Sequence, residues 1–188
     1  MLDKWLNKRN GDHDGRYGDN DTSYEKAAAF LNEGSVEDWG GGTGYAKRFF
    51  INQQYSNVDG TNDYCDVYVD LREYKSKVQN ILMRHVLEHN VDWKKILLNA
   101  LESCNKLALV IFTPFGEETK QIAWVVGQEV PDISFRKSDI TDCFEGRKWL
   151  EETFESEGSV YKTETIFYVY PHAILTKQER LCKQLHLS

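Results

Sequence analysis

Long apolar runs are missing from this sequence. No stretch approaches the ~18–20 consecutive apolar residues that a membrane-spanning helix requires, and the opening residues lack the apolar core of a secretion signal. The four cysteines lie far apart and never form a Cys-x-x-Cys pair, so the pattern indicates neither a zinc site nor a disulfide framework. We therefore expect reduced thiols, a cytoplasmic location and no membrane partner.

Basic residues are also scarce, since 23 Lys and Arg stand against 30 Asp and Glu, for a net charge of -7. Proteins that bind nucleic acid present a basic surface, so we predict no nucleic-acid partner. With 40% hydrophobic residues, the chain is expected to fold as one domain over 1–188. We place its core at 22–170, after a flexible segment 1–21 and before a tail 171–188.

A glycine-rich turn connects two predicted strands, at 35–38 and 55–59. A strand, a glycine turn, a helix (here 45–50) and a strand that ends in Asp form a nucleotide-binding half-unit. No Lys-Ser/Thr follows Gly44, so the turn is not a phosphate-binding P-loop. The dinucleotide fingerprint fits poorly because Tyr45 stands where its third glycine is expected. A tight turn without a ligand is the structural alternative.

The glycine turn fills the pattern acid-x-Gly-x-Gly-x-Gly with Asp38, Gly40, Gly42 and Gly44. This resembles the first motif of the class I S-adenosylmethionine-dependent methyltransferases. The resemblance implies that the loop wraps the methionine part of the cofactor and that Asp38 helps to hold its ammonium group. Asp59, followed by Gly60, ends the next strand, where a carboxylate can accept hydrogen bonds from both ribose hydroxyls.

A third predicted strand, 67–71, ends in Asp70 and Leu71. The resemblance implies that Asp70 binds the adenine amino group and that the backbone of Leu71 reaches the ring. A helix cap or a solvated strand end is the alternative for Asp70. The connection 60–66 is too short for the crossover helix that the family usually has there.

The fourth predicted strand, 80–84, runs into the sequence His85-Val86-Leu87-Glu88-His89, which also resembles many of these methyltransferases. The resemblance places Arg84 and His85 beside the cofactor. If the acceptor is a hydroxyl, His85 is the first candidate for its base, because histidine titrates near neutrality. Glu117 and Glu118 are second candidates, although a solvated loop explains them as well.

The same residues match His-x-x-Glu-His, the signature of inverted zinc metallopeptidases. Two histidines at i and i+4 share a helix face, but no third ligand is marked by its spacing. A zinc hydrolase is therefore a remote alternative, and we predict no metal site.

The remaining pattern completes the predicted fold, which is α/β with a doubly wound, mostly parallel sheet and an antiparallel C-terminal strand pair. The expected elements are helices at 22–31, 93–102 and 138–144, with 148–154 as a continuation of the last, a buried strand at 106–112 and two strands within 158–170. Residues 119–138 are expected to contact substrate.

Together these features predict transfer of a methyl group from S-adenosylmethionine, with S-adenosylhomocysteine as product. The Asn/Asp-Pro-Pro-Tyr/Phe signature of DNA amino-methyltransferases is absent, so a small molecule, sugar or metabolite is the expected acceptor. A non-catalytic protein that binds the cofactor, or a scaffold with the same fold, is the alternative. The first segment, with Trp5, Arg16 and Tyr17, is either a disordered tail or a flap over the site.

Overall fold

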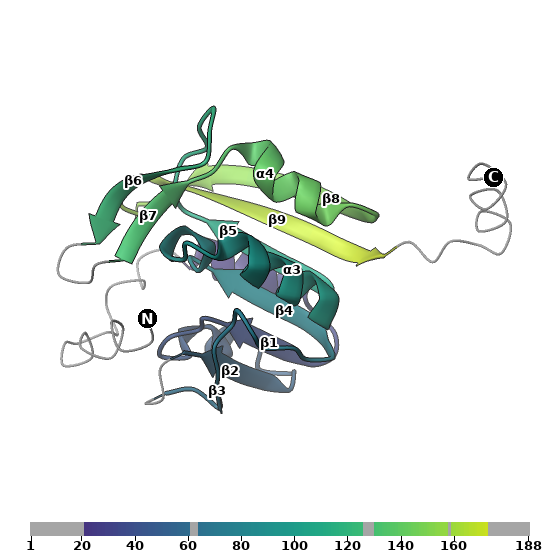
Figure 1. Ribbon diagram of the computed structural model, residues 1–188. Coiled ribbons are helices and arrows are strands. Elements are labelled where there is room, and N and C mark those ends of the chain that lie inside the picture. The colour runs from purple at the N-terminus through teal and green to yellow at the C-terminus, as the bar shows by residue number, and fades with distance from the viewer. Residues whose placement is uncertain (1–20, 61–63, 126–129, 158, 173–188) are drawn as a thin grey trace, which may run out of the picture.

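The computed structural model describes residues 21–60, 64–125, 130–157 and 159–172 (Figure 1). The predicted flap and tail fall on segments 1–21 and 171–188. Most of both segments lies outside the described residues. The centre of the molecule is a seven-stranded sheet in the order β3-β2-β1-β4-β5-β9-β8. Its strands are β1 (Val36–Trp39), β2 (Tyr55–Asp59), β3 (Val67–Tyr68), β4 (Val78–Arg84), β5 (Cys104–Ile111), β8 (Arg147–Glu155) and β9 (Thr163–His172).

The five strands from β3 to β5 are parallel, and β9 and β8 follow as antiparallel neighbours. This arrangement confirms the predicted fold class. The strand order reverses at β1, which pairs with β2 on one side and with β4 on the other. In such sheets ligands bind outside the carboxyl ends of the strands at the reversal, so the ends of β1, β2 and β4 mark the candidate site.

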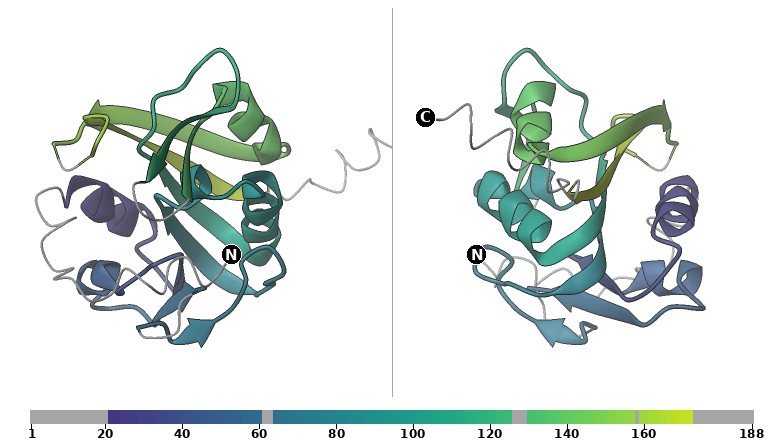
Figure 2. Two further views of the ribbon diagram at one scale, coloured as in Figure 1. Left: turned by 60° about the vertical axis from the view of Figure 1, so that its left-hand side comes forward. Right: turned by 90° about the vertical axis from the view of Figure 1, so that its right-hand side faces the viewer.

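Helices cover both faces of the sheet, as the right-hand view of Figure 2 shows edge-on. One face carries α2 (Thr22–Phe30) and the 3-10 helix η1 (Tyr45–Phe49), and the other carries α3 (Trp93–Ser103) and α4 (Lys137–Thr141). Strand side chains alternate between two apolar clusters, so Leu82 packs toward α2 while Ile81 and Met83 pack toward α3. This double covering explains why β4 and β5 read as continuous apolar runs.

Several predicted elements differ from the structure. Residues 148–154, predicted to extend a helix, lie in β8, because pairing with β9 outweighs the helix-forming residues of this segment. Residues 158–170, predicted as two strands, contribute only β9, so the antiparallel pair consists of β8 and β9. The third strand is only Val67–Tyr68, which leaves Asp70 and Leu71 in the loop after it.

A hairpin of β6 (Lys120–Val125) and β7 (Val130–Ser134) lies in the segment 119–138, where no element was predicted. Figure 1 shows it beyond the end of β5, and β7 contacts the 3-10 helix η2 (Leu87–His89) that follows β4. It therefore lies at the same edge of the sheet as the candidate site. Among the described residues, no helix is both long and apolar enough to cross a membrane.

Candidate functional site

The glycine loop begins at the end of β1 in a conformation that other residues adopt only with strain. Gly40, Gly42 and Gly44 have φ angles of 76°, 55° and 75°. A Cβ at Gly40 would lie 2.6 Å from Val86 Cγ2, closer than any real contact. The loop is thus packed against the residue that precedes η2. A Cβ at Gly42 would meet no heavy atom within 4 Å, so the loop faces open space there.

Strand β2 binds the glycine loop through two polar side chains. Asp59 Oδ2 accepts a hydrogen bond from the Gly42 N–H at 2.8 Å, and Gly60 follows it directly. Asn57 Nδ2 donates to the carbonyl oxygens of Gly42 at 2.9 Å and of Tyr64 at 3.0 Å. Asn57 was not among the predicted site residues. Its signal was a polar residue on the same face of the strand as Asp59, two positions earlier.

Asp38 lies beneath the loop, with 3% of its surface exposed. Its Oδ2 accepts a hydrogen bond from the Tyr55 hydroxyl at 2.6 Å, and a Cβ at Gly41 would lie 2.5 Å from the same oxygen. Burial, together with the charge of Asp59, raises the pKa of Asp38 to about 7, although the hydrogen bond from Tyr55 lowers it. Contact of Asp38 with a cofactor ammonium group stays a prediction.

The raised pKa of Asp38 makes the free energy of unfolding depend on pH. Between its ordinary pKa of 3.8 and about 7 the folded state binds more protons than the unfolded state, so this group's contribution to stability falls as pH rises. We expect Asp38→Asn to remove a decline of up to ~1.4 kcal/mol per pH unit in that window. Urea unfolding at several pH values measures the difference between variant and wild type. Glu73→Gln, an exposed carboxylate, should leave the profile unchanged.

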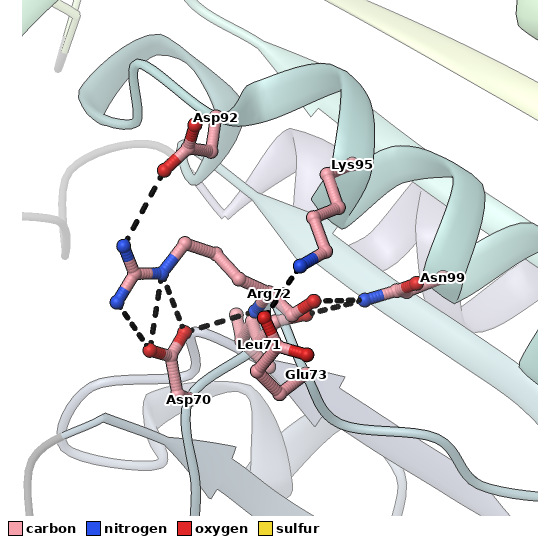
Figure 3. Close-up of polar contacts among 7 residues, drawn as sticks. All are labelled: Asp70, Leu71, Arg72, Glu73, Asp92, Lys95 and Asn99. Carbon is pink, nitrogen blue, oxygen red and sulfur yellow. Dashed lines mark hydrogen bonds and ion pairs between the residues drawn. The ribbon is translucent and has the colours of Figure 1, made fainter.

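Asp70 has partners that were not predicted (Figure 3). Its two oxygens accept hydrogen bonds from the Arg72 guanidinium, and its Oδ1 also accepts from the Arg72 backbone N–H at 2.9 Å. These bonds lower the pKa of Asp70, and Arg72 reaches Asp92 at 3.4 Å as well. The Leu71 carbonyl accepts a hydrogen bond from Asn99 on α3. Asp70 therefore orients Arg72, while Arg72 and the Leu71 carbonyl hold the loop against Asp92 and α3. The adenine contacts of Asp70 and Leu71 stay predictions.

Arg84 and His85 share one carboxylate, Glu164 of β9. Glu164 Oε1 lies 2.7 Å from Arg84 Nη2 and 2.9 Å from His85 Nε2, and the Glu164 side chain is completely buried. Arg84 also donates hydrogen bonds to Ser23 and Tyr24 of α2, so its guanidinium joins α2 to β9. Neither the sequence pattern nor the resemblance indicated Glu164. A cofactor contact of Arg84 stays a prediction.

His85 was predicted as the base because histidine titrates near neutrality, but in the structure His85 does not. Burial and the adjacent Arg84 charge lower its pKa to about 3, although Glu164 acts in the opposite direction. His85 is therefore a neutral imidazole whose Nε2 lies against Glu164 Oε1. Its φ of 57° is unusual for a residue other than glycine and marks the sharp turn between β4 and η2.

A second polar group is centred on His89, whose ring also packs near that of Phe112. His89 Nδ1 lies 3.2 Å from Asp132 Oδ1 and 3.0 Å from the Pro131 carbonyl oxygen of β7. The Tyr161 hydroxyl donates to Asp132 Oδ2 at 3.0 Å. The Phe112 ring centroid is 4.7 Å from that of His85, 5.4 Å from that of His89 and 5.8 Å from that of Tyr161. The hairpin is thereby joined to the strand ends.

The residues around the second candidates for the base, and around the alternative zinc site, support neither prediction. Glu117 and Glu118 are exposed, and Glu118 pairs with Lys120. His85 and His89 bind different carboxylates, and within the described ranges no group of three or more His, Cys, Asp or Glu could hold a metal ion. The residues of the His-x-x-Glu-His pattern therefore take part in the packing between η2, β7 and β9.

No protein-family model and no curated protein matches the sequence, whereas many solved structures share its fold. One is the Burkholderia thailandensis 1,6-didemethyltoxoflavin-N1-methyltransferase with bound 1,6-didemethyltoxoflavin and S-adenosylhomocysteine. It is 11% identical with a TM-score of 0.63 over 86% of this chain and 80% of that chain. The YcgJ protein of Bacillus subtilis is 11% identical with a TM-score of 0.61 over 82% of this chain and 100% of its own.

Two further structures extend the comparison. A Haloferax volcanii methyltransferase in complex with the Trm112 activator is 13% identical with a TM-score of 0.57, over 92% of this chain and 98% of that chain. The N-terminal domain of EvdMO1, in the presence of S-adenosylhomocysteine and D-fucose, is 12% identical with a TM-score of 0.55, over 83% and 85%. With the strand order described above, these matches show that the chain has the Rossmann-like fold of the class I S-adenosylmethionine-dependent methyltransferases.

Proposed function

We propose that this protein transfers a methyl group from S-adenosylmethionine to a small-molecule, sugar or metabolite acceptor. The observation that carries the proposal is the hydrogen bond from Gly42 to Asp59. It joins the glycine loop of β1 to the carboxylate that ends β2, at the point where the strand order reverses. Structures of the same fold that were crystallised with S-adenosylhomocysteine support this cofactor.

The residues at the edge of the sheet fit the cofactor. Gly40, Gly42 and Gly44 would surround its methionine part, because the loop faces open space at Gly42. Asp59 and Gly60 would hold the ribose. Asp38 would bind the ammonium group, and Asp70 and Leu71 would bind the adenine. Arg84 would also contact the cofactor.

The protein's main task in this reaction is alignment. S-adenosylmethionine supplies a methyl group that its sulfonium already activates. The chain then has to orient the acceptor in line with that methyl group and exclude water, which can contribute several kcal/mol of barrier lowering, up to ~7–11 kcal/mol for ideal alignment. The rigid turn at His85, held by Glu164, and the hairpin joined to η2 would form the acceptor side of such a site.

Charge and the structural neighbours support the proposed acceptor class. A net charge of -7 disfavours nucleic acid and anionic membrane surfaces. Two proteins of the same fold were crystallised with the small molecules 1,6-didemethyltoxoflavin and D-fucose. A cytoplasmic protein that methylates a metabolite is consistent with these properties.

Calorimetric titration of the full chain with S-adenosylmethionine, and separately with S-adenosylhomocysteine, tests the proposal. We expect one binding site with a micromolar dissociation constant, about -8 kcal/mol. A folded protein that binds neither molecule would rule out the proposed function.

A cofactor-binding protein without methyl transfer is the second candidate. It is favoured by the two-residue length of β3, which leaves little structure around the adenine side. Formation of S-adenosylhomocysteine during incubation with a metabolite extract would exclude this candidate. Tight cofactor binding with no turnover above a cofactor-only blank would support it.

A further inference from the structure

A cluster of polar and aromatic side chains meets at the ends of β4 and β5, and the roles assigned so far do not use it. We call it the acceptor cluster, and it consists of Glu88, His89, Phe112, Asp132 and Tyr161. Its members come from η2, the end of β5, β7 and the turn before β9. Glu88 is completely buried, and its Oε1 accepts a hydrogen bond from the Phe112 N–H at 2.7 Å. This bond fixes η2, which carries His89, to the end of β5.

His89 and Asp132 have the geometry of a histidine held by a carboxylate. Both the Asp132 carboxylate and the Pro131 carbonyl lie at Nδ1, at 3.2 Å and 3.0 Å, and both are acceptors. The proton of a neutral His89 is therefore on Nδ1, and Nε2 carries the lone pair. Tyr161 donates to the second oxygen of Asp132, which fixes the orientation of that carboxylate.

The cluster is connected to the proposed cofactor loop through Val86. Val86, which precedes η2, packs against Gly40 at the start of the loop, and His89 ends the same short helix. The Phe112 ring packs against the rings of both His85, at the end of β4, and His89. An acceptor that faces the cofactor's methyl group from this side would therefore meet His89 and its aromatic neighbours.

We propose that His89, held by Asp132 and Tyr161, is the general base for a phenolic hydroxyl acceptor. This rests on the proposed methyl-transfer function. The acceptor oxygen forms a bond to the methyl carbon, and the carbon–sulfur bond breaks with its electron pair passing to sulfur. The hydroxyl proton passes to His89 Nε2, and Asp132 stabilises the imidazolium that results.

The charges of the surrounding groups favour a neutral acceptor. Asp132 in the cluster and Glu164 beside His85 have lowered pKa values and carry negative charge, whereas burial raises the pKa of Glu88 to about 7. The nearby Arg84 is already paired with Glu164, so an acidic acceptor would meet no unpaired cation among these groups. The Phe112 and Tyr161 rings favour an aromatic acceptor, since rings pack in offset or edge-to-face contact.

His89 is better suited to accept a proton than His85. Burial alone would lower the pKa of His89, but Asp132 and Glu88 together with the Pro131 carbonyl raise it above its ordinary value. The pKa of His85 is near 3, so His85 accepts a proton poorly at neutral pH. Burial and the same Asp132 contact raise the pKa of Tyr161 to about 12, so its hydroxyl remains a donor.

The test uses the full chain saturated with S-adenosylhomocysteine and titrated with 4-nitrophenol, whose colour reports its ionisation. We expect the wild type to bind the probe as nitrophenolate, which lowers its apparent pKa by about one unit, or about tenfold in ionisation. His89→Gln should abolish this shift. Asp132→Asn should reduce the shift in the apparent pKa of the probe. The pH midpoint of the remaining nitrophenolate absorbance should fall, because Asp132 no longer raises the pKa of His89.

His172→Gln is the matched control, because His172 is an exposed histidine of β9 outside the cluster. It should behave as the wild type does. No ionisation of the probe by the loaded wild type, or equal ionisation by folded His89→Gln, would overturn the inference. Failure of the wild type to bind S-adenosylhomocysteine is a separate result, which would overturn the proposed function and this inference with it.

Discussion

Replacement of Asp59 with alanine is expected to weaken binding of S-adenosylmethionine by about 100-fold. Hydrogen bonds to a charged group contribute about 1.5–3 kcal/mol each, and this carboxylate can accept from both ribose hydroxyls. Loss of ~2.7 kcal/mol corresponds to two powers of ten in affinity. Calorimetric titration of the variant and the wild type measures the change directly.

Two controls separate loss of the ribose contact from loss of the loop. Asp59→Asn keeps an acceptor for the Gly42 N–H but removes the charge, so its affinity should lie between those of wild type and Asp59→Ala. Asp142→Ala removes an exposed carboxylate of the 3-10 helix η3 (Asp142–Phe144) and should bind normally. Unchanged affinity of a folded Asp59→Ala variant would show that Asp59 does not hold the cofactor.

Replacement of Arg84 with leucine is expected to lower the free energy of unfolding by about 3–5 kcal/mol, because it leaves a buried charge without its partner. The Arg84 and Glu164 side chains are 6% and 0% exposed, and their contact joins β4, β9 and, through Ser23 and Tyr24, helix α2. Without Arg84, Glu164 retains the neutral His85 and the Ser23 hydroxyl as polar partners, and no charged one among these residues. Urea unfolding, compared at equal m-value, measures the loss.

The Lys75–Glu102 pair provides the matched control, because both of its side chains are more than half exposed. Lys75→Ala should change stability by no more than about 1 kcal/mol. The double variant Arg84→Leu with Glu164→Leu should recover much of the loss, since it removes both buried charges. An Arg84→Leu variant as stable as the wild type would contradict this account of the pair.

The sequence by itself determined the central parallel sheet and the place of the candidate site. Strand β2 has the predicted bounds, 55–59, and β1, β4 and β5 lie within two residues of theirs at each end. These predictions depended on local signals, namely glycines at positions of positive φ, polar residues at the ends of β2 and β4, and apolar runs long enough for buried strands. Such signals survive folding because they reflect the conformation and burial of each segment.

Only the tertiary structure decided which side chains meet across elements. Residues 148–154 became a strand because β9 offered a partner, and His85 lost its basicity because folding buried it beside Arg84. Glu164 and Asp132 are distant in sequence from the histidines that they bind. Pairing of strands, burial of charge and hydrogen bonds between distant residues depend on the arrangement of the whole chain. The sequence around each residue carries no local signal for them.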